Sequence, residues 1–468
     1  MRHTSSSLPG QPGHPAWSPL QSGLSLARPD VLPAGALRGV AILLSALGLA
    51  LMLISLQPYV GASMVSETGP SQGSPINQYG FLAAGLVFAL AVTSLASRKA
   101  LASVLTPGFL LLGLLLAYNV ATSPESALAL RAVILTVIGM VIAFSVIILP
   151  RGERDFQIAL TLALLAALAM SYGGLIVFPD LARHGYDAYE PQHSGLWRGH
   201  FSHKNIAGPV MCVIAICGVY LMRSGQRLLG LIIFAAGTLF VIQTGSKTTS
   251  GLFPIAILIV FSATLFGRAA AAILLTLMAL ASAWLFTIGS LNHPRISYLV
   301  LDFLGDQTYT GRTTLWEFSL SKIMDHPWFG FGLYNFWGTD NVFGLDAPFE
   351  SAWDYRFIIH GHNNYLDILL NLGFVGGGLL TWILFIGPMF NYARARRNPG
   401  NRKLADMFFM IIVFVSLLSF LETFFLARND PIWLMHVFAV FGLHLLARFD
   451  INAGTALPGK PSRRPKPA

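Results

Sequence analysis

Long apolar stretches recur through this chain of 468 residues. Each runs for about 17 to 25 residues, the length that crosses the hydrocarbon core of a bilayer as an α-helix. Hydrophobic residues make up 54% of the sequence and charged residues 11%, and the mean hydropathy is +0.63, a combination that is rare in soluble proteins. We therefore predict an all-α polytopic membrane protein of about 12 transmembrane helices, beginning near Ala36, Tyr79, Ala100, Ala127, Phe156, Ile206, Leu228, Gly251, Ala269, Asn364, Ala405 and Pro431.

The distribution of positive charge predicts the orientation, because Lys and Arg are enriched in short cytoplasmic loops. With a cytoplasmic N-terminus, 20 of the 30 Lys and Arg residues fall on the cytoplasmic side, against 5 of the 21 acidic residues. We expect both termini to be cytoplasmic. The net charge of +9 follows from this topology. The basic loops lack the interleaved aromatic residues that grip nucleic acid, so we expect no nucleic-acid partner.

Two sizeable loops are predicted outside the cytoplasm. Residues 1–35 read as a disordered cytoplasmic tail without a cleavable signal peptide, and residues 450–468 as a basic cytoplasmic tail. Residues 36–290 hold the first nine predicted helices with an outer loop at 179–205, and residues 364–449 hold the last three. Between them lies an extracytoplasmic loop at 291–363, long enough for a few short helices. Loops of this length usually form lids or binding surfaces.

A basic run ends the first outer loop. It extends from Trp197 to Asn205, reads WRGHFSHKN, and leads directly into the sixth predicted helix. Such a run can hold a phosphate through its cations, free backbone N–H groups and the helix dipole. It can equally be an interfacial anchor, with Trp and Lys at headgroup depth. The spacing leaves both interpretations open for His203, Lys204 and Asn205.

A second polar run, TGSKTT, occupies residues 244–249 between two predicted helices. It imitates part of a P-loop, but no Gly directly precedes Lys247 and the run faces a compartment without ATP, so we reject a nucleotide site. A single Lys in a short outer loop is typical of a snorkelling side chain. Lys247 nevertheless breaks the charge rule among the short outer loops, which makes it a candidate anion ligand.

A third motif lies in the long outer loop, where Gly311-Arg312-Thr313 with Trp316 is followed by Pro327, Gly330 and Gly332. The Arg312 guanidinium is planar and permanently charged, and suits bidentate phosphate contacts. The alternative is an ion pair between Arg312 and a nearby acid, Asp302, Asp306 or Glu317.

The fourth motif, HGHNNY, spans residues 360–365, where the chain re-enters the membrane. A His at a membrane rim can take a proton from a hydroxyl near neutral pH, with neighbouring Asn side chains to orient a ligand. Zinc ligation is an alternative that would use His360 and His362 with His200 and His203. The sequence has no HExxH pattern and no Cys ligand outside the membrane, so we expect no metal.

These motifs together predict a basic, His-containing site on the outer face that suits a lipid-anchored diphosphate. They also resemble the bacterial O-antigen ligases and polymerases, including exopolysaccharide polymerases. The resemblance covers roughly residues 197–449, and the run around His203-Lys204-Asn205 is most similar to that of the exopolysaccharide polymerases. The matching segments are residues 199–205, 246–248, Gly311-Arg312 with Trp316, the turn at 327–332, and 362–366 with Gly373 and Gly376.

The resemblance implies an inverting, metal-independent membrane glycosyltransferase of the GT-C type, without cofactors, in the bacterial inner membrane. It would polymerise or transfer undecaprenyl-diphosphate-linked oligosaccharides to a glycan acceptor on the periplasmic face. Arg312 would bind the donor diphosphate, and His362 would be the general base or orient the acceptor. Many relatives carry Arg where this chain has Lys247, which keeps the charge but loses the fork geometry. The implied substrate-binding residues are Lys204, Lys247, His203, Asn205, His360, Asn363 and Trp316.

Two alternatives remain. A ligase would move finished glycan to lipid A core with the same chemistry, and a transporter for lipid-linked sugar would need ionisable groups near the membrane midplane. Deep charge is sparse, because Asp367 and Glu422 are predicted near helix ends. A chain-length regulator and a flippase are the protein partners that the polymerase interpretation implies, with the lipid bilayer as surroundings.

Overall fold

A computed structural model describes residues 36–54, 58–59, 75–186, 191–346, 353–427 and 430–452. Within these ranges the regular structure is helical and contains no strand, only an isolated bridge between Arg183 and Trp197. The predicted all-α polytopic membrane fold is therefore confirmed. The tail predicted at 1–35, and the tail predicted at 450–468 from residue 453 onward, lie outside the described residues.

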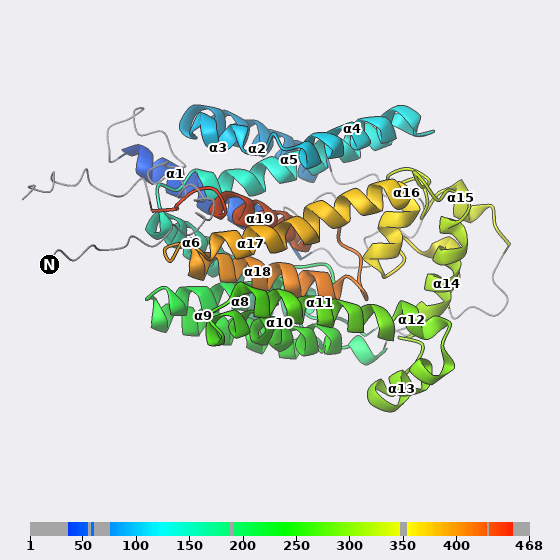
Figure 1. Ribbon diagram of the computed structural model, residues 1–468. Helices are drawn as coiled ribbons and strands as arrows, with labels where there is room; N and C mark the ends of the chain where they lie inside the picture. The colour runs from blue at the N-terminus through cyan, green and yellow to red at the C-terminus, as the bar shows by residue number, and fades with distance from the viewer. Residues whose placement is uncertain are drawn as a thin grey trace, which may run out of the picture.

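The long helices run side by side as a bundle, and short helices gather at one of its ends (Figure 1). The bundle contains α1 (Ala36–Leu53), α2 (Pro75–Leu95), α3 (Arg98–Ala102), α4 (Pro107–Thr122), α5 (Ser126–Ile148), α6 (Glu153–Val177), α8 (Lys204–Arg223), α9 (Arg227–Gln243), α10 (Lys247–Leu265), α11 (Ala269–Phe286), α16 (Asn364–Thr381), α17 (Gly387–Ala395), α18 (Arg402–Leu418) and α19 (Pro431–Leu446). A π-helical segment, η4 (Trp382–Ile386), joins α16 to α17.

The predicted outer loops contain only short elements. These are α7 (Pro179–Ala182), η2 (Pro191–His193), α12 (Ile288–Leu291), α13 (Pro294–Leu304), α14 (Arg312–Ile323), α15 (Asp340–Phe343) and η3 (Tyr355–Phe357). A second hydrophobic core attaches the long loop to the bundle, because Trp316 of α14 and Phe336 pack with Leu366 and Leu370 of α16.

Seven described helices are long and apolar enough to cross a membrane, and α1, α4, α9 and α19 are shorter apolar helices. The predicted starts agree with helices throughout, except that the third span begins later than Ala100. Its membrane-length part is α4, which starts at Pro107 because Thr106 caps the helix and Pro favours the first helical position. The total of 12 spans stays a prediction.

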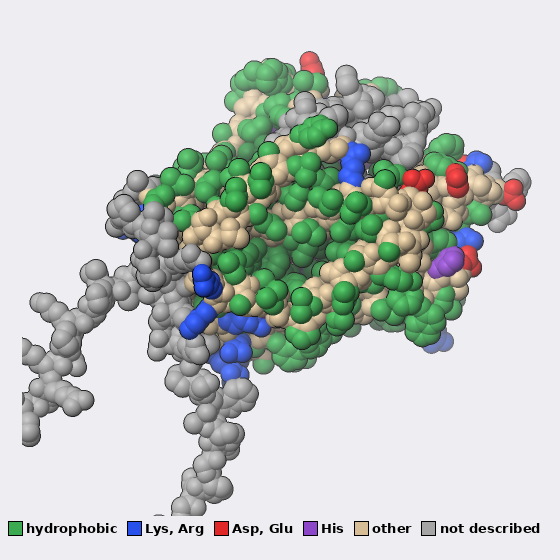
Figure 2. Space-filling view, turned by 90° about the horizontal axis from the view of Figure 1, so that it is seen from above, with side chains coloured by type: hydrophobic (Ala, Val, Ile, Leu, Met, Phe, Trp, Pro, Cys, Tyr) green, Lys and Arg blue, Asp and Glu red, His purple; other side chains and the backbone are tan. Residues whose placement is uncertain are grey.

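Hydrophobic side chains cover much of the flank between the two ends of the bundle, and the charged side chains in view lie mainly toward the ends (Figure 2). The interior is built around α8, α18 and α19, most of whose residues are buried. Helix α8 approaches α9 closely at Gly218, Gly230 and Gly237, where an added Cβ would lie 2.5–2.9 Å from the backbone of the neighbouring helix. Small residues allow such contacts between membrane helices.

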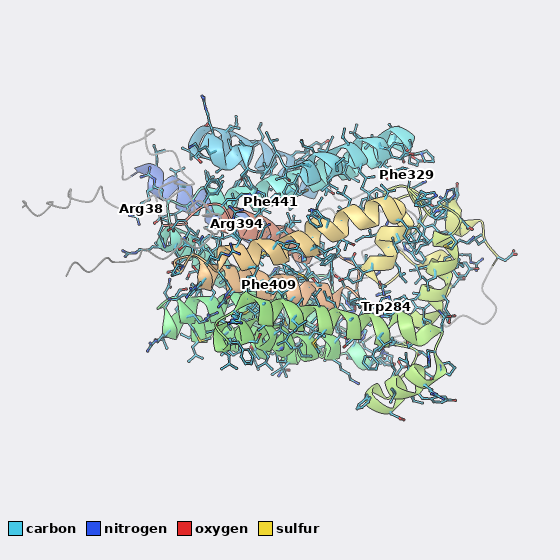
Figure 3. All side chains as sticks on the ribbon, viewed as in Figure 1. Arg38, Trp284, Phe329, Arg394, Phe409 and Phe441 are labelled. Carbon is cyan, nitrogen blue, oxygen red and sulfur yellow. The ribbon has the colours of Figure 1, made fainter. Side chains whose placement is uncertain are left out.

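The end predicted to be cytoplasmic is held by buried ion pairs. Asp406 of α18 accepts hydrogen bonds from Arg223 at the end of α8, at 2.8 Å, and from Arg396 after α17. At the same end of the bundle lie Arg38 and Arg394, opposite the end that carries Phe329 (Figure 3). Residues that the charge pattern assigned to one compartment thus lie together in space.

Helix α16 is broken at Gly373, where φ is 61° and ψ is −168°. The turn at 327–332 fills the break with its own backbone. The N–H groups of Phe331 and Gly332 donate to the carbonyls of Leu370 and Asn371, at 2.7 and 3.0 Å. In return, the carbonyls of Pro327 and Trp328 accept from Phe374 and Val375, at 2.7 and 3.1 Å. The turn thus supplies partners for backbone groups on both sides of the break, as a buried backbone requires.

We expect Gly373→Ala to destabilise the protein by about 3 kcal/mol or more, because left-handed strain adds to a clash with backbone. A Cβ at Gly373 would lie 2.3 Å from the carbonyl carbon of Trp328. A Cβ added at Gly378, in the same helix, would meet nothing within 4 Å, so Gly378→Ala is the control and should leave stability equal or higher. Thermal unfolding in detergent measures both. Equal melting temperatures for the two variants would contradict this account of the break.

The predicted topology can be tested by thiol labelling, since Cys212 and Cys217 are buried and free. Phe357 is 74% exposed, and Pro399 is exposed at the opposite end of the bundle. In spheroplasts, an impermeant maleimide should label Phe357→Cys before lysis and Pro399→Cys only after lysis. Labelling of both variants before lysis would contradict the predicted orientation.

Candidate functional site

Arg312 is the first residue of α14 and follows a tightly wound turn. Tyr309, Thr310 and Gly311 are all left-handed, with φ of 51°, 64° and 85°. The Asp306 carboxylate holds this turn by accepting hydrogen bonds from the Thr308 and Thr310 backbone N–H groups, at 2.8 and 2.6 Å. Partial burial raises the pKa of Asp306, but hydrogen bonds from the Thr308 hydroxyl and from these two N–H groups lower it below the ordinary value overall. Asp306 therefore shapes the turn and does not pair with Arg312.

His362 lies in the segment that re-enters the membrane, with a left-handed φ of 50°. Buried hydrogen bonds of the two residues that follow His362 attach this segment to the chain after α18. Asn363 donates to the Phe420 carbonyl at 3.1 Å and caps α16 through its side-chain oxygen. The Asn364 oxygen accepts from the Phe425 N–H at 3.0 Å.

Asp367, one turn into α16, accepts further hydrogen bonds that hold these segments together. Its buried carboxylate accepts from the Gly361 N–H at 3.0 Å, the Trp337 indole at 2.7 Å and the Thr423 hydroxyl at 2.6 Å. The segment before α16, the long outer loop and the chain after α18 therefore meet on one side chain. This arrangement fixes His362 and Glu422 relative to each other.

Glu422 joins the third and fourth motifs. One carboxylate oxygen accepts from the Arg312 guanidinium at 2.9 Å, and the other lies 3.2 Å from His362 Nδ1. Arg312 also donates to the Leu421 carbonyl. The three side chains are 14–16% exposed, so they are shielded without being sealed. Burial raises the pKa of Glu422, but Arg312 and His362 outweigh it and lower the pKa to about 2.

Aromatic rings surround His362. The His360 ring lies 4.3 Å and the Trp353 ring 5.5 Å from it, centroid to centroid. Burial, with the nearby His362, lowers the pKa of His360 to about 3, so this ring is neutral at physiological pH. Its Nδ1 is buried without a hydrogen-bond partner among the described residues. The neutral His360 ring thus packs against the ring of His362.

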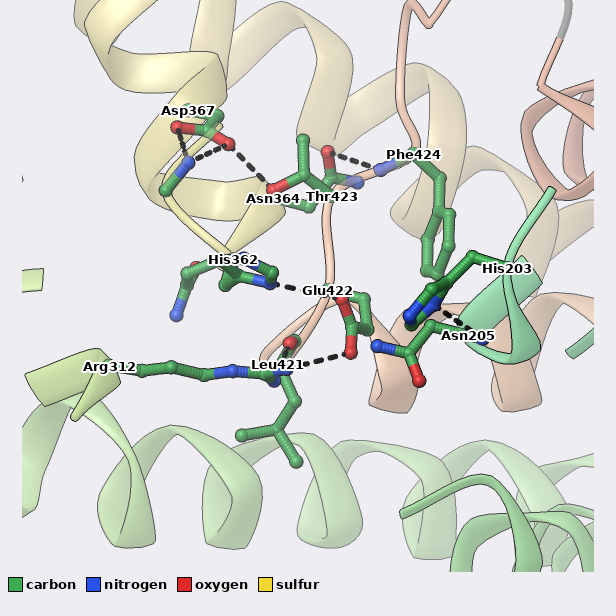
Figure 4. A network of polar contacts seen from close by, with 12 residues as sticks. His203, Asn205, Arg312, His362, Asn364, Asp367, Leu421, Glu422, Thr423 and Phe424 are labelled. Carbon is green, nitrogen blue, oxygen red and sulfur yellow. Dashed lines mark hydrogen bonds and ion pairs between the residues drawn. The ribbon is translucent and has the colours of Figure 1, made fainter. Parts of the chain in front are cut away.

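The first motif lies on the other side of Glu422, as Figure 4 shows for His203 and Asn205. His203 caps α8, and its Nδ1 accepts from the Asn205 N–H at 3.1 Å. Its ring lies 4.8 Å from that of His184 and 5.7 Å from that of His193. Burial and the neighbouring cations lower the pKa of His203 to about 4, with Glu422 acting in the opposite direction.

Lys204 and Lys247 occupy different positions. Lys204 is buried at the first residue of α8, directly after His203. Lys247 is exposed at the start of α10 and takes no part in the described ion pairs of Arg312 and Glu422. Its loop still borders the first motif, because the Trp197 N–H donates to the Gln243 carbonyl at 3.1 Å.

Two residues that are predicted to contact a ligand, Trp316 and Asn363, are buried. Trp316 is fully buried, with its ring 5.3 Å from that of Tyr309, so it packs inside the second core. Asn363 is fully buried, and its amide is used by the cap and by Phe420. Both residues pack close to the site, and their contact with a ligand stays a prediction.

The N-termini of α8, α14 and α16 converge at this end of the bundle, each beside a residue of the predicted site. Helix N-termini carry partial positive charge and favour anions. The described residues contain no group of three or more His, Cys, Asp or Glu side chains arranged to hold a metal ion. The site combines fixed positive charge, a carboxylate-bound imidazole and a shielded position at one end of the bundle.

Glu422 is the functional candidate that the motifs missed. It follows the eleventh predicted helix, which begins near Ala405, and nothing near it in sequence resembles a catalytic motif. The only available signal was an acidic residue, rare in a chain with 11% charged residues, at the outer end of a helix. The nearby acids considered as partners of Arg312 were the wrong ones, because its partner lies 110 residues away.

Comparison with known proteins shows what the chain is similar to. Residues 210–381 match the O-antigen ligase family. The chain is also 30% identical over 115 residues to the exopolysaccharide production protein ExoQ of Rhizobium meliloti (strain 1021). That match covers 23% of this chain and spans only a quarter, 25%, of the relative's own length. These matches confirm the resemblance to the O-antigen ligase superfamily over part of the chain.

Proposed function

We propose that this chain, which resembles the O-antigen ligase superfamily, is a glycosyltransferase that polymerises undecaprenyl-diphosphate-linked oligosaccharide units. The reaction would take place on the periplasmic face of the bacterial inner membrane, with both termini in the cytoplasm. One observation carries the proposal: Arg312 and His362, from separate motifs, share the carboxylate of Glu422 beside His203. The similarity to an exopolysaccharide production protein supports polymerisation.

The chemistry that we propose needs no activation of the leaving group, because a glycosyl diphosphate already carries a good one. The acceptor hydroxyl attacks the anomeric carbon opposite the diphosphate and inverts its configuration. The new C–O bond forms, the bond to the diphosphate oxygen breaks with its electron pair, and the hydroxyl proton passes to His362. Positioning the two glycans and stabilising the departing charge are the protein's tasks.

Fixed cations would stabilise the departing diphosphate. Arg312 uses two N–H groups for Glu422 and Leu421, and a guanidinium has further donors that can reach a phosphate oxygen. We assign Lys204 and the α8 N-terminus to the same diphosphate. His203, Asn205 and His360 would contact the glycan, and exposed Lys247 would contact a more distant part of the donor. This electrostatic role requires neither a metal nor a cofactor.

A ligase that transfers finished glycan to lipid A core would use the same residues with another acceptor. A transporter is less compatible with the site, since the described Arg312–Glu422–His362 cluster lies at one end of the bundle. The break in α16 is also filled by the outer loop. A flippase and a chain-length regulator would be partners of the polymerase.

Purified protein in liposomes with a synthetic lipid-diphosphate oligosaccharide tests the function. A polymerase yields a ladder of products on a gel. In cells that lack the protein, accumulated single repeat units indicate a polymerase and accumulated long lipid-linked chains indicate a ligase. Absence of any glycan transfer, with correctly folded protein and several donors, would contradict the glycosyltransferase proposal.

Replacing Arg312 tests the assigned cation. Arg312→Ala should lower the transfer rate by about a thousandfold, because a fixed donor at the departing charge is lost. Arg312→Lys should keep part of the activity, since it keeps the charge but not the fork. Arg356→Ala is the control, because Arg356 pairs with Asp354 in the same outer loop. Rates in liposomes, with membrane insertion verified, measure the effect. Normal transfer by Arg312→Ala would remove Arg312 from the mechanism.

Replacing His362 tests the assigned base. His362→Ala should lower transfer by about a hundredfold to ten-thousandfold, the usual contribution of a general base. Binding of the lipid-linked donor should persist, since the charge of Arg312 and Lys204 is unchanged. Donor binding is measured separately with a fluorescent lipid diphosphate. Full turnover in this variant would leave the reaction without an assigned base.

A further inference from the structure

Glu422 divides its carboxylate between two neighbours of different chemistry. One oxygen accepts from the permanently charged guanidinium of Arg312, and the other from the ring of His362. Its position is fixed from both sides, because Leu421 is hydrogen-bonded to Arg312 and Thr423 is hydrogen-bonded to Asp367. The carboxylate is thus held in place by its neighbours along the chain as well as by its own ion pairs.

The charge on Glu422 decides which nitrogen of His362 carries the proton. An ionised carboxylate can only accept hydrogen bonds, so Nδ1 of His362 must be the N–H donor. In the neutral ring, Nε2 then holds the lone pair and can accept a proton. When Nε2 takes that proton, the imidazolium lies against a fixed negative charge, which stabilises it.

A bare carboxylate beside a diphosphate would repel it. Arg312 offsets the negative charge of Glu422, and the two side chains together are neutral. The structure therefore keeps a carboxylate next to the base without adding net negative charge that would repel an anionic substrate. An apolar or amide residue at position 422 would place no negative charge beside His362 and would leave the charge of Arg312 without a partner.

We infer that Glu422 is a positioning residue for the proposed reaction: it sets His362 with Nε2 as the proton acceptor and holds Arg312 beside it. This inference rests on the proposed function and adds a residue that the sequence motifs do not contain. The alternative is a purely structural role, in which Glu422 only ties the chain after α18 to the outer loop.

Glu422→Gln separates the two roles, because it keeps the size and shape of the side chain but removes its charge and replaces one acceptor oxygen with an NH2 donor. In the liposome assay we expect kcat to fall by about a thousandfold or more, as when an orienting carboxylate becomes an amide in a catalytic triad. The KM for the donor should not rise, since Arg312 loses an ion pair and keeps its charge. Glu422→Asp should recover part of kcat.

Asp325→Asn is the matched control, because Asp325 pairs with Lys322 on the outer loop and is 51% exposed. It should behave as wild type in kcat, KM and melting temperature. Wild-type kcat in Glu422→Gln would overturn the inference. A joint loss of donor binding, turnover and melting temperature, without recovery by Glu422→Asp, would also overturn it and indicate a structural tie. If wild-type protein transfers no glycan, the proposed function itself fails.

Discussion

A backbone buried in a membrane protein must pair its N–H and C=O groups within the protein, and this requirement shapes the surroundings of the site. Helix α16 stops and restarts at Gly373 because the turn at 327–332 supplies the missing partners. The same turn connects α14, which begins with Arg312, to the chain that leads to His362. These backbone hydrogen bonds therefore also attach the chain between the two functional motifs to α16.

Side-chain hydrogen bonds then fix the start of α16 more closely. Asn363, Asn364 and Asp367 use buried hydrogen bonds to attach the start of α16 to the chain after α18. Buried polar networks of this kind are stabilising only when each member is paired, and they specify one arrangement. This network holds Glu422 so that its side chain faces both Arg312 and His362. The fold therefore brings the three charged or titratable groups together, in addition to the attraction between them.

The sequence predicted the local features well. Apolar length gave the helices, and the four polar runs gave most of the residues that surround the site. It could not predict contacts between segments far apart in the chain. Glu422 meets Arg312 across 110 residues, and no periodicity or motif reports such a pairing. Asn363 was predicted to contact a ligand because it follows His362, and Trp316 because it belongs to the Arg312 motif; the sequence did not show that both are buried and pack within the protein.

The site is assembled from two units with different supports. Arg312, Glu422 and His362 are bound to one another through α14, α16 and the chain after α18, whereas His203 and Asn205 belong to α8, which packs closely on α9. A small displacement of α8 relative to α16 would widen or narrow the gap between His203 and Glu422 and leave the Arg312–Glu422–His362 contacts unchanged. Under the proposed function, such a displacement would move His203 relative to a glycan bound beside His362.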